Sequence, residues 1–200
     1  EVPAAGILGS RGCPFLCAFC CIPAIGHKVR IRSPKNVVDE MEEVYDQCRG
    51  AYGFVDDCFI LNKARILEFC QEIVDRRMKV KFIASTRANT LDREIVKALS
   101  RAGCTDLYFG VESGSERVRN QVIKKKLSDK QIAQAIRLCR EHRIMSNLFL
   151  MVGFPTETKS EMLETARIGK KVKADIIGIH ITIPFPGTEV FRYAIDHKMI

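Results

Sequence analysis

The sequence predicts an α/β protein in which six strands alternate with helices around one parallel sheet. Three observations predict this fold: short apolar runs recur between segments of helical periodicity, the runs are almost continuously apolar, and no linker or convincing repeat divides the chain. Such alternation is typical of parallel βαβ units, and apolar strands are typical of sheets covered on both faces. We therefore expect one domain over residues 1–200, with a barrel-like or doubly wound sheet.

The first predicted strand covers residues 5–9, and a cysteine-rich loop follows it. A helix is predicted to begin at Ser33 and Pro34, because serine is a common N-cap and proline suits the first helical position. The helix is expected to end at Gly50, and the second strand to cover residues 51–55. The apolar positions of this helix recur at the spacing of one face: Val37, Val38, Met41, Val44, Tyr45 and Cys48.

The middle of the chain repeats this alternation. A helix is predicted over residues 63–76 and the third strand over residues 80–84. Thr90 is expected to cap the next helix, which ends at Gly103, and residues 106–110 form the fourth strand.

In the last part of the chain, two capping-box patterns mark helix starts. Ser128 with Gln131 opens one helix before the fifth strand, residues 147–152. Thr158 with Glu161 opens another, which runs to about residue 171. The sixth strand covers residues 176–183, a turn covers 184–188, and a last helix begins near residue 189. His180, within the sixth strand, is expected to be a core or substrate-side residue.

Composition and charge exclude several classes of protein. With 46% hydrophobic and 28% charged residues, the chain is neither disordered nor fibrous, and no apolar run approaches the roughly 20 residues of a membrane span. Its first residues lack signal-peptide features and resemble a strand entered partway, so we expect a region of a longer chain. The net charge is +8, but only Lys124, Lys125 and Lys126 cluster, and we expect them in a solvated loop. Binding of RNA is the weaker alternative.

The strongest chemical signal is the spacing of Cys13, Cys17 and Cys20 on the loop after the first strand. Three nearby thiolates are soft ligands for an iron–sulfur cluster or zinc. A cubane has four irons, so three thiolates leave one iron open for another ligand. Zinc in a structural site requires four ligands, and His27 is the residue that could complete one. A thioredoxin-like redox motif is a further alternative, although the usual setting at a helix start is missing.

The remaining six cysteines show no ligand spacing among themselves. Those on apolar helix faces are expected to behave as small buried hydrophobes. A secreted disulfide scaffold would be shorter and richer in loops, so we expect a reducing, cytoplasmic compartment. These six residues are Cys21, Cys48, Cys58, Cys70, Cys104 and Cys139.

Taken together, the segments SRGCPFLCAFC, FVDDCF, STRAN, FGVESGS, GFPTET and PFPGT resemble the radical S-adenosylmethionine (SAM) superfamily over the whole chain. The resemblance implies a partial TIM-type (βα)6 barrel with parallel strands and outer helices. It also implies a 4Fe–4S cluster on Cys13, Cys17 and Cys20, whose open iron chelates the methionine part of SAM. In the family, the reduced cluster cleaves SAM to methionine and a 5′-deoxyadenosyl radical, which takes hydrogen from a substrate.

The resemblance further implies contacts with SAM at the strand ends. Asp56 and Asp57 lie where the family binds the SAM amino group, although the common Gly-Gly-Glu form is absent. Arg87 would pair with the SAM carboxylate, since a guanidinium binds a carboxylate through two hydrogen bonds. Glu112, within a GxES-like segment, would approach the ribose and methionine. The full set of implied contacts is Phe19, Asp56, Asp57, Ser85, Arg87, Glu112, Ser113, Gly153 and Ile181.

The motif combination most resembles the branch with an N-terminal cobalamin-binding domain, whose members methylate carbons or rearrange rings. The resemblance therefore implies cobalamin held outside this segment, a small-molecule substrate, and a reducing partner such as flavodoxin or ferredoxin. A methylthiotransferase-like enzyme acting on tRNA or protein is the neighbouring alternative. A non-catalytic iron–sulfur electron carrier and a zinc-stabilised nucleic-acid-binding module are alternatives of other classes.

Overall fold

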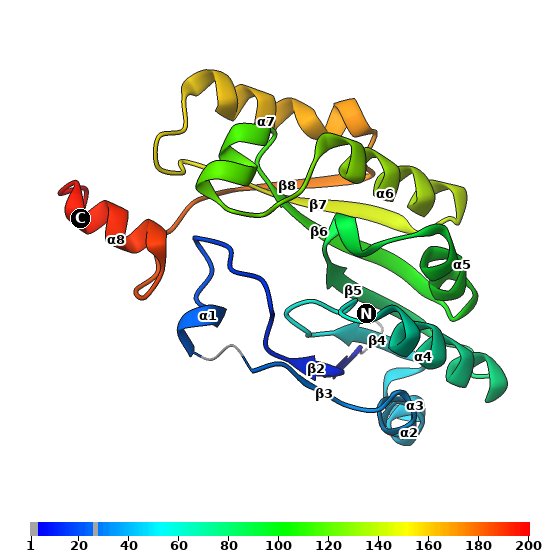
Figure 1. Cartoon of the computed structure of the whole chain (residues 1–200). Helices are drawn as coiled ribbons and strands as arrows, with labels where there is room; N and C mark the ends of the chain where they lie inside the picture. The colour runs from blue at the N-terminus through cyan, green and yellow to red at the C-terminus, as the bar shows by residue number, and fades with distance from the viewer. Residues whose placement is uncertain (1–3, 26–27) are drawn as a thin grey trace.

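The computed structural model, which describes residues 4–25 and 28–200, contains one six-stranded sheet in which every pairing is parallel (Figure 1). The strand order is β1-β4-β5-β6-β7-β8, so the strands follow one another in chain order without reversal. A doubly wound sheet reverses its order at a switch point, whereas a barrel does not. The fold is therefore the open, barrel-like one. The strands are β1 Ala5–Ile7, β4 Ala51–Phe54, β5 Lys81–Thr86, β6 Cys104–Glu112, β7 Met145–Val152 and β8 Ile176–Ile181.

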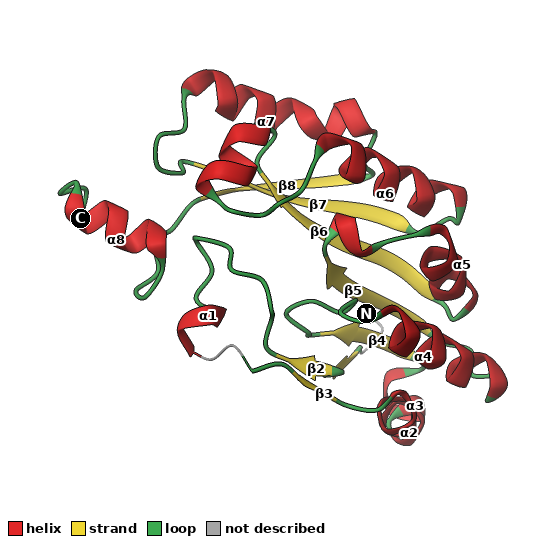
Figure 2. Ribbon diagram, viewed as in Figure 1, coloured by secondary structure: helices red, strands yellow, loops and turns green. Residues whose placement is uncertain are grey.

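The main helices lie along one face of this sheet and leave the other face toward the cysteine loop (Figure 2). Between these helices and the sheet lies the main core, which includes four phenylalanines with ring centroids 4.4–6.2 Å apart: Phe54, Phe59, Phe69 and Phe82. The helices are α1 Ile22–Ile25, α2 Pro34–Glu43, α3 Tyr45–Cys48, α4 Lys63–Asp75, α5 Arg93–Arg101, α6 Asp129–Glu141, α7 Lys159–Val172 and α8 Glu189–Asp196.

Most of the predicted helix starts are confirmed. Ser33 caps α2, and the capping boxes of Ser128 and Thr158 are both formed. The prediction for Thr90 was wrong: α5 begins after Asp92, whose carboxylate accepts a hydrogen bond from the Ile95 amide at 2.9 Å. Thr90 instead ends a short 3-10 helix, Ala88–Thr90, and its hydroxyl donates to the Arg87 carbonyl.

Short elements without hydrophobic periodicity were not predicted. β2 Ser10–Arg11 pairs antiparallel with β3 Arg30–Ile31, and these two strands bracket the cysteine loop and α1. A π-helix, Val118–Val122, follows β6. Within the described ranges, no helix has the length and apolar character needed to cross a membrane.

Candidate functional site

The cysteine loop is fixed to three separate parts of the fold by its backbone. The Gly12 amide donates to Asp57 Oδ2 at 2.9 Å, just beyond β4. The Ala18 amide donates to the Ile123 carbonyl at 3.0 Å, and the Ala18 carbonyl accepts from the Val190 amide of α8 at 3.2 Å. The loop is therefore held over the sheet even though it contains little secondary structure.

The loop and the carboxyl ends of three strands enclose a cavity of about 210 Å³. Active sites of parallel α/β barrels form at this edge, because the loops that follow all the strands meet there. Eight of the predicted site residues line the cavity: Cys13, Cys17, Phe19, Cys20, Asp57, Ser85, Arg87 and Glu112. Seven further residues complete the lining: Phe15, Cys58, Thr86, Tyr108, Gly110, Lys125 and Phe149.

The three loop cysteines are free thiols and are half-buried. Burial is the main cause that raises the pKa of the Cys13 and Cys20 thiols, because it disfavours the charged thiolate. In residues 4–25 and 28–200, no three His, Cys, Asp or Glu side chains meet closely enough to hold a single metal ion. A cubane distributes its ligands over separate irons, so three soft donors around one cavity fit such a cluster. His27, the residue that would complete a zinc site, lies outside the described residues.

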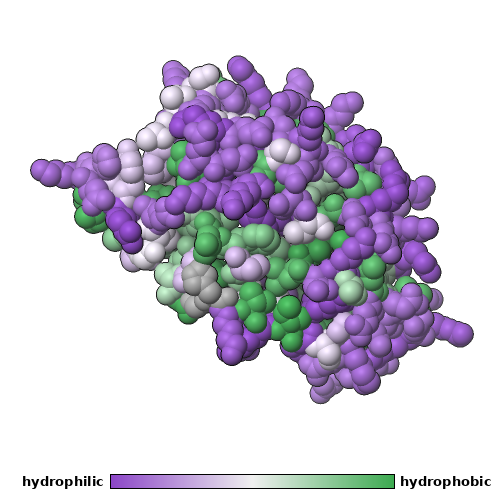
Figure 3. Space-filling model, in the orientation of Figure 1, coloured by the Kyte–Doolittle hydropathy of each residue, from purple (hydrophilic) through white to green (hydrophobic). Residues whose placement is uncertain are grey.

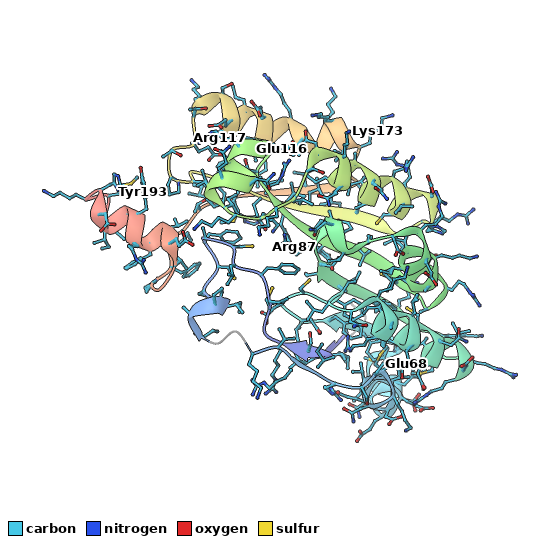
Figure 4. All side chains as sticks on the ribbon, viewed as in Figure 1. Glu68, Arg87, Glu116, Arg117, Lys173 and Tyr193 are labelled. Atoms are coloured by element: carbon cyan, nitrogen blue, oxygen red, sulfur yellow. The ribbon has the colours of Figure 1, made fainter. Side chains whose placement is uncertain are left out.

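Arg87 is a cation in direct contact with one of the loop thiols. It follows β5, is buried, and lies in the middle of the molecule in Figure 4. Its Nη1 lies 3.6 Å from Cys17 Sγ, and its guanidinium carbon lies 3.9 Å from the centroid of the Phe15 ring. Its Nη2 donates to the Lys125 carbonyl. These contacts fix a positive, planar donor at the wall of the cavity.

A buried ion pair adjoins Arg87 in the cavity lining. Lys125 Nζ lies 2.7 Å from Glu112 Oε1, and both side chains are less than a tenth exposed. Glu112 has a φ of 68°, in the left-handed region that non-glycine residues rarely adopt, and such strain is concentrated at functional sites. The pair lies over Gly110, where a Cβ would come within 2.4 Å of Glu112 Oε1. A larger residue at this position would force the ends of both side chains to shift.

The prediction of a solvated loop over Lys124, Lys125 and Lys126 was wrong for Lys125. Lys124 and Lys126 are exposed, whereas Lys125 is only 5% exposed. Both flanking lysines have positive φ values, 61° and 53°, and this alternation turns Lys125 inward.

Four of the predicted contacts do not line the cavity. Asp56 is buried and accepts hydrogen bonds from the Gly9 amide and the Ser10 hydroxyl, so it holds the start of the cysteine loop. Burial is the main cause that raises its pKa. Ser113 is fully buried and bonds to Thr165. Gly153 and Ile181 are exposed at the ends of β7 and β8, and a Cβ on Gly153 would meet nothing within 4 Å.

Sequence reasoning missed Cys58 and Lys125 as cavity residues. Cys58 is buried beside Thr86, with 3.8 Å between its sulfur and the Thr86 hydroxyl, and burial raises its pKa. Sequence reasoning also missed Tyr108 and Gly110, although the alternation of residues along a strand could have indicated them. Alternate residues of a strand face the same side, so Tyr108 and Gly110 lie on one face of β6.

Comparison with known proteins gives a consistent result. A family model described as the radical SAM superfamily matches residues 7–168. An uncharacterised methyltransferase of Pyrococcus horikoshii is 32% identical over all of this chain and 44% of its own length. The anaerobic magnesium-protoporphyrin IX monomethyl ester cyclase of Cereibacter sphaeroides is 31% identical over 92% of this chain and 31% of its own length.

One solved structure matches with a TM-score of 0.89 at 24% identity, over 97% of this chain and 39% of its own. It is the radical SAM methyltransferase TsrM from Kitasatospora setae, determined with cobalamin and a [4Fe-4S] cluster bound. This likeness shows that the fold is shared. The chain spans less than half the length of each of these three proteins.

Proposed function

This chain belongs to the radical SAM superfamily, and we propose from that premise that its cavity holds a 4Fe–4S cluster and SAM for radical chemistry. One observation carries the proposal: three free thiols, a buried guanidinium and a buried ion pair line a single cavity at the carboxyl ends of parallel strands. A cluster confined to electron transfer would not require these additional polar groups.

Different residues of the chain would bind the cluster and SAM. Cys13, Cys17 and Cys20 would ligate three irons, which leaves the fourth open to the amino and carboxylate groups of SAM. When bound, the cluster supplies an electron to SAM, which separates into methionine and a 5′-deoxyadenosyl radical. Arg87 would orient the carboxylate of SAM, since its guanidinium is already fixed by Phe15 and by the Lys125 carbonyl.

The polar residues beside the cluster would fix the rest of SAM. Asp57 lines the cavity and already holds the Gly12 amide, so it is the better placed of the two aspartates to accept a hydrogen bond from the SAM ammonium. The Glu112–Lys125 pair offers one more acceptor and donor near the ribose. Phe19 packs edge-on against Phe154, with ring centroids 5.9 Å apart, and would help to keep water from the adenosine.

The overall reaction that we propose is methyl transfer or ring rearrangement with cobalamin, held by a domain outside residues 1–200. The support is the likeness to the Pyrococcus methyltransferase, the magnesium-protoporphyrin ester cyclase and TsrM. A reducing protein such as flavodoxin or ferredoxin would supply the electron. All nine cysteines are free thiols, which supports a reducing, cytoplasmic location.

The test uses the full-length protein, reconstituted anaerobically with iron and sulfide and then reduced. On addition of SAM, we expect 5′-deoxyadenosine to form, measured by mass spectrometry. The electron paramagnetic resonance spectrum of the reduced cluster should change when SAM binds. The electron-carrier alternative would be supported instead if the cluster forms, its spectrum does not change on addition of SAM, and no 5′-deoxyadenosine is produced.

Gly110→Ala is expected to weaken SAM binding by about tenfold, which corresponds to about 1.4 kcal/mol. The added methyl group would displace the Glu112–Lys125 pair, with which its Cβ would overlap. The measurement is the dissociation constant for SAM, with iron content determined on the same sample. Gly53→Ala is the matched control on another strand, because its Cβ would meet only Ile83 at 3.9 Å. Equal SAM affinity of the two variants would contradict a role for the pair in binding.

A further inference from the structure

An aromatic row crosses three adjacent strands on the face of the sheet opposite the main core. We define it as Tyr108 of β6, Phe149 of β7 and His180 of β8. The Tyr108 and Phe149 rings are stacked, with centroids 5.4 Å apart and planes inclined by 24°. The His180 ring meets Phe149 edge-on, with centroids 6.2 Å apart.

The central ring of this row is flanked by glycines. In the register of the sheet, Phe149 is opposite Gly110 on one neighbouring strand and Gly178 on the other. Neither glycine carries a side chain, so the space beside the ring is filled only by side chains that reach over from neighbouring positions. Over Gly110 lies the Glu112–Lys125 pair, and over Gly178 lean His180 and Phe149 itself.

The row remains accessible in the folded chain. Phe149 is 39% exposed, His180 is exposed, and Tyr108 is half-buried. Figure 3 shows hydrophobic residues gathered in the middle of the molecule, with hydrophilic residues around them. In a closed barrel, branched aliphatic side chains fill the interior, whereas here aromatic rings and glycines leave it open. Tyr108 and Phe149 also line the cavity that contains the three loop cysteines.

We propose that the aromatic row binds the planar aromatic or heteroaromatic ring of the substrate, beside the position where SAM is cleaved. This inference rests on the proposed function and names the substrate class for the same site. Exposed ring faces stack with other aromatic rings in offset or edge-on geometry, and a saturated ring cannot do so equally well. His180 adds one hydrogen-bonding nitrogen at the far end of the row. The row thus selects a flat ring and holds it within reach of the cavity.

The test measures binding of a planar probe and its saturated counterpart to full-length, cluster-loaded protein. The probes are 2-naphthoate and decahydro-2-naphthoate, which carry the same carboxylate on two fused six-membered rings. Calorimetry should show that 2-naphthoate binds at least tenfold more tightly. Phe149→Leu keeps an apolar side chain but removes the ring, and we expect it to weaken 2-naphthoate binding by five- to tenfold while leaving decahydro-2-naphthoate unchanged. Phe185→Leu, at an exposed phenylalanine outside the row, is the matched control and should change neither.

Two results would overturn the inference. One is equal affinity for the planar and saturated probes. The other is competition between 2-naphthoate and S-adenosylhomocysteine, with both weakened by Phe149→Leu, since the row would then hold the adenine of SAM. Cleavage of SAM is assayed on the same samples. If SAM is cleaved but 2-naphthoate is not preferred, only the proposed role of the aromatic row is rejected. If SAM is not cleaved, the proposed function is rejected.

Discussion

Cys17→Ala is expected to abolish both cluster retention and formation of 5′-deoxyadenosine, while the apoprotein stays folded. Cys17 supplies one of three thiols on the loop, so its loss would leave a cluster with two protein ligands and a second open iron. Cys17 lies outside the main core and is only partly buried against a smaller cluster that includes Ala18 and Phe154, so the fold should not depend on this thiol. The measurements are iron content and 5′-deoxyadenosine by mass spectrometry. Thermal unfolding of the two apoproteins should agree within about 3 °C, the shift expected for roughly 1 kcal/mol in a domain of this size.

Cys21→Ala is the matched control for this experiment. Cys21 lies on the same loop and is also half-buried, but it does not line the cavity. We expect this variant to keep its iron and its activity. Normal SAM cleavage in Cys17→Ala would refute the ligand assignment. Equal losses in both variants would show that the loop is merely sensitive to substitution.

Arg119→Met is expected to lower the free energy of unfolding by about 3 kcal/mol. The Arg119 side chain is fully buried, and its nitrogens donate to the Ser113 and Leu127 carbonyls and to Asp129 at 2.5–2.8 Å. Methionine fills similar space but donates no hydrogen bond, so the Ser113 carbonyl would lose its partner and the Leu127 carbonyl would keep only its bond from Asn120. The measurement is the midpoint of urea unfolding for the apoprotein.

Arg117→Met provides the comparison within the same segment. Arg117 is exposed beside α7 and pairs with Glu161 at 2.7 Å (Figure 4). Ion pairs with an exposed partner contribute little to stability, and the Glu161 carboxylate, although only 12% exposed, keeps its hydrogen bonds from Ser115 and Thr158 when Arg117 is replaced. We expect the urea midpoint of this variant to match the wild type. A midpoint shift as large as that of Arg119→Met would show that burial does not decide the effect.

The strand and helix rhythm could be predicted because hydrophobic periodicity is a local property of the sequence. The six strands and most helix starts follow from it. Residue type alone could not decide between Thr90 and Asp92 as N-cap, since both cap helices well. In the structure the Thr90 hydroxyl donates to the Arg87 carbonyl, and the Asp92 carboxylate accepts from the Ile95 amide. The bracketing strands β2 and β3 have two residues each, too few for any pattern.

The candidate site was predictable where a motif coincides with a strand end. Cys13, Arg87 and Glu112 belong to this class, and all line the cavity. Which of Asp56 and Asp57 faces the cavity depends on the backbone conformation of the turn after β4. The sequence does not reveal that conformation. Lys125 was misplaced because its inward direction requires positive φ at two neighbouring lysines. Lysine has no intrinsic preference for that conformation, so tertiary contacts impose it.

The chain-order sheet has a consequence for how the protein is made. Each strand pairs with the next strand of the sheet along the chain, so the barrel can assemble from the N-terminal side during translation. The loop thiols leave the ribosome long before Arg87, Glu112 and Lys125, which later enclose them. During that interval Cys17 and Cys20 are open to oxidants and to each other. Oxygen present during translation should therefore reduce the yield of cluster-competent protein more than the same exposure after folding.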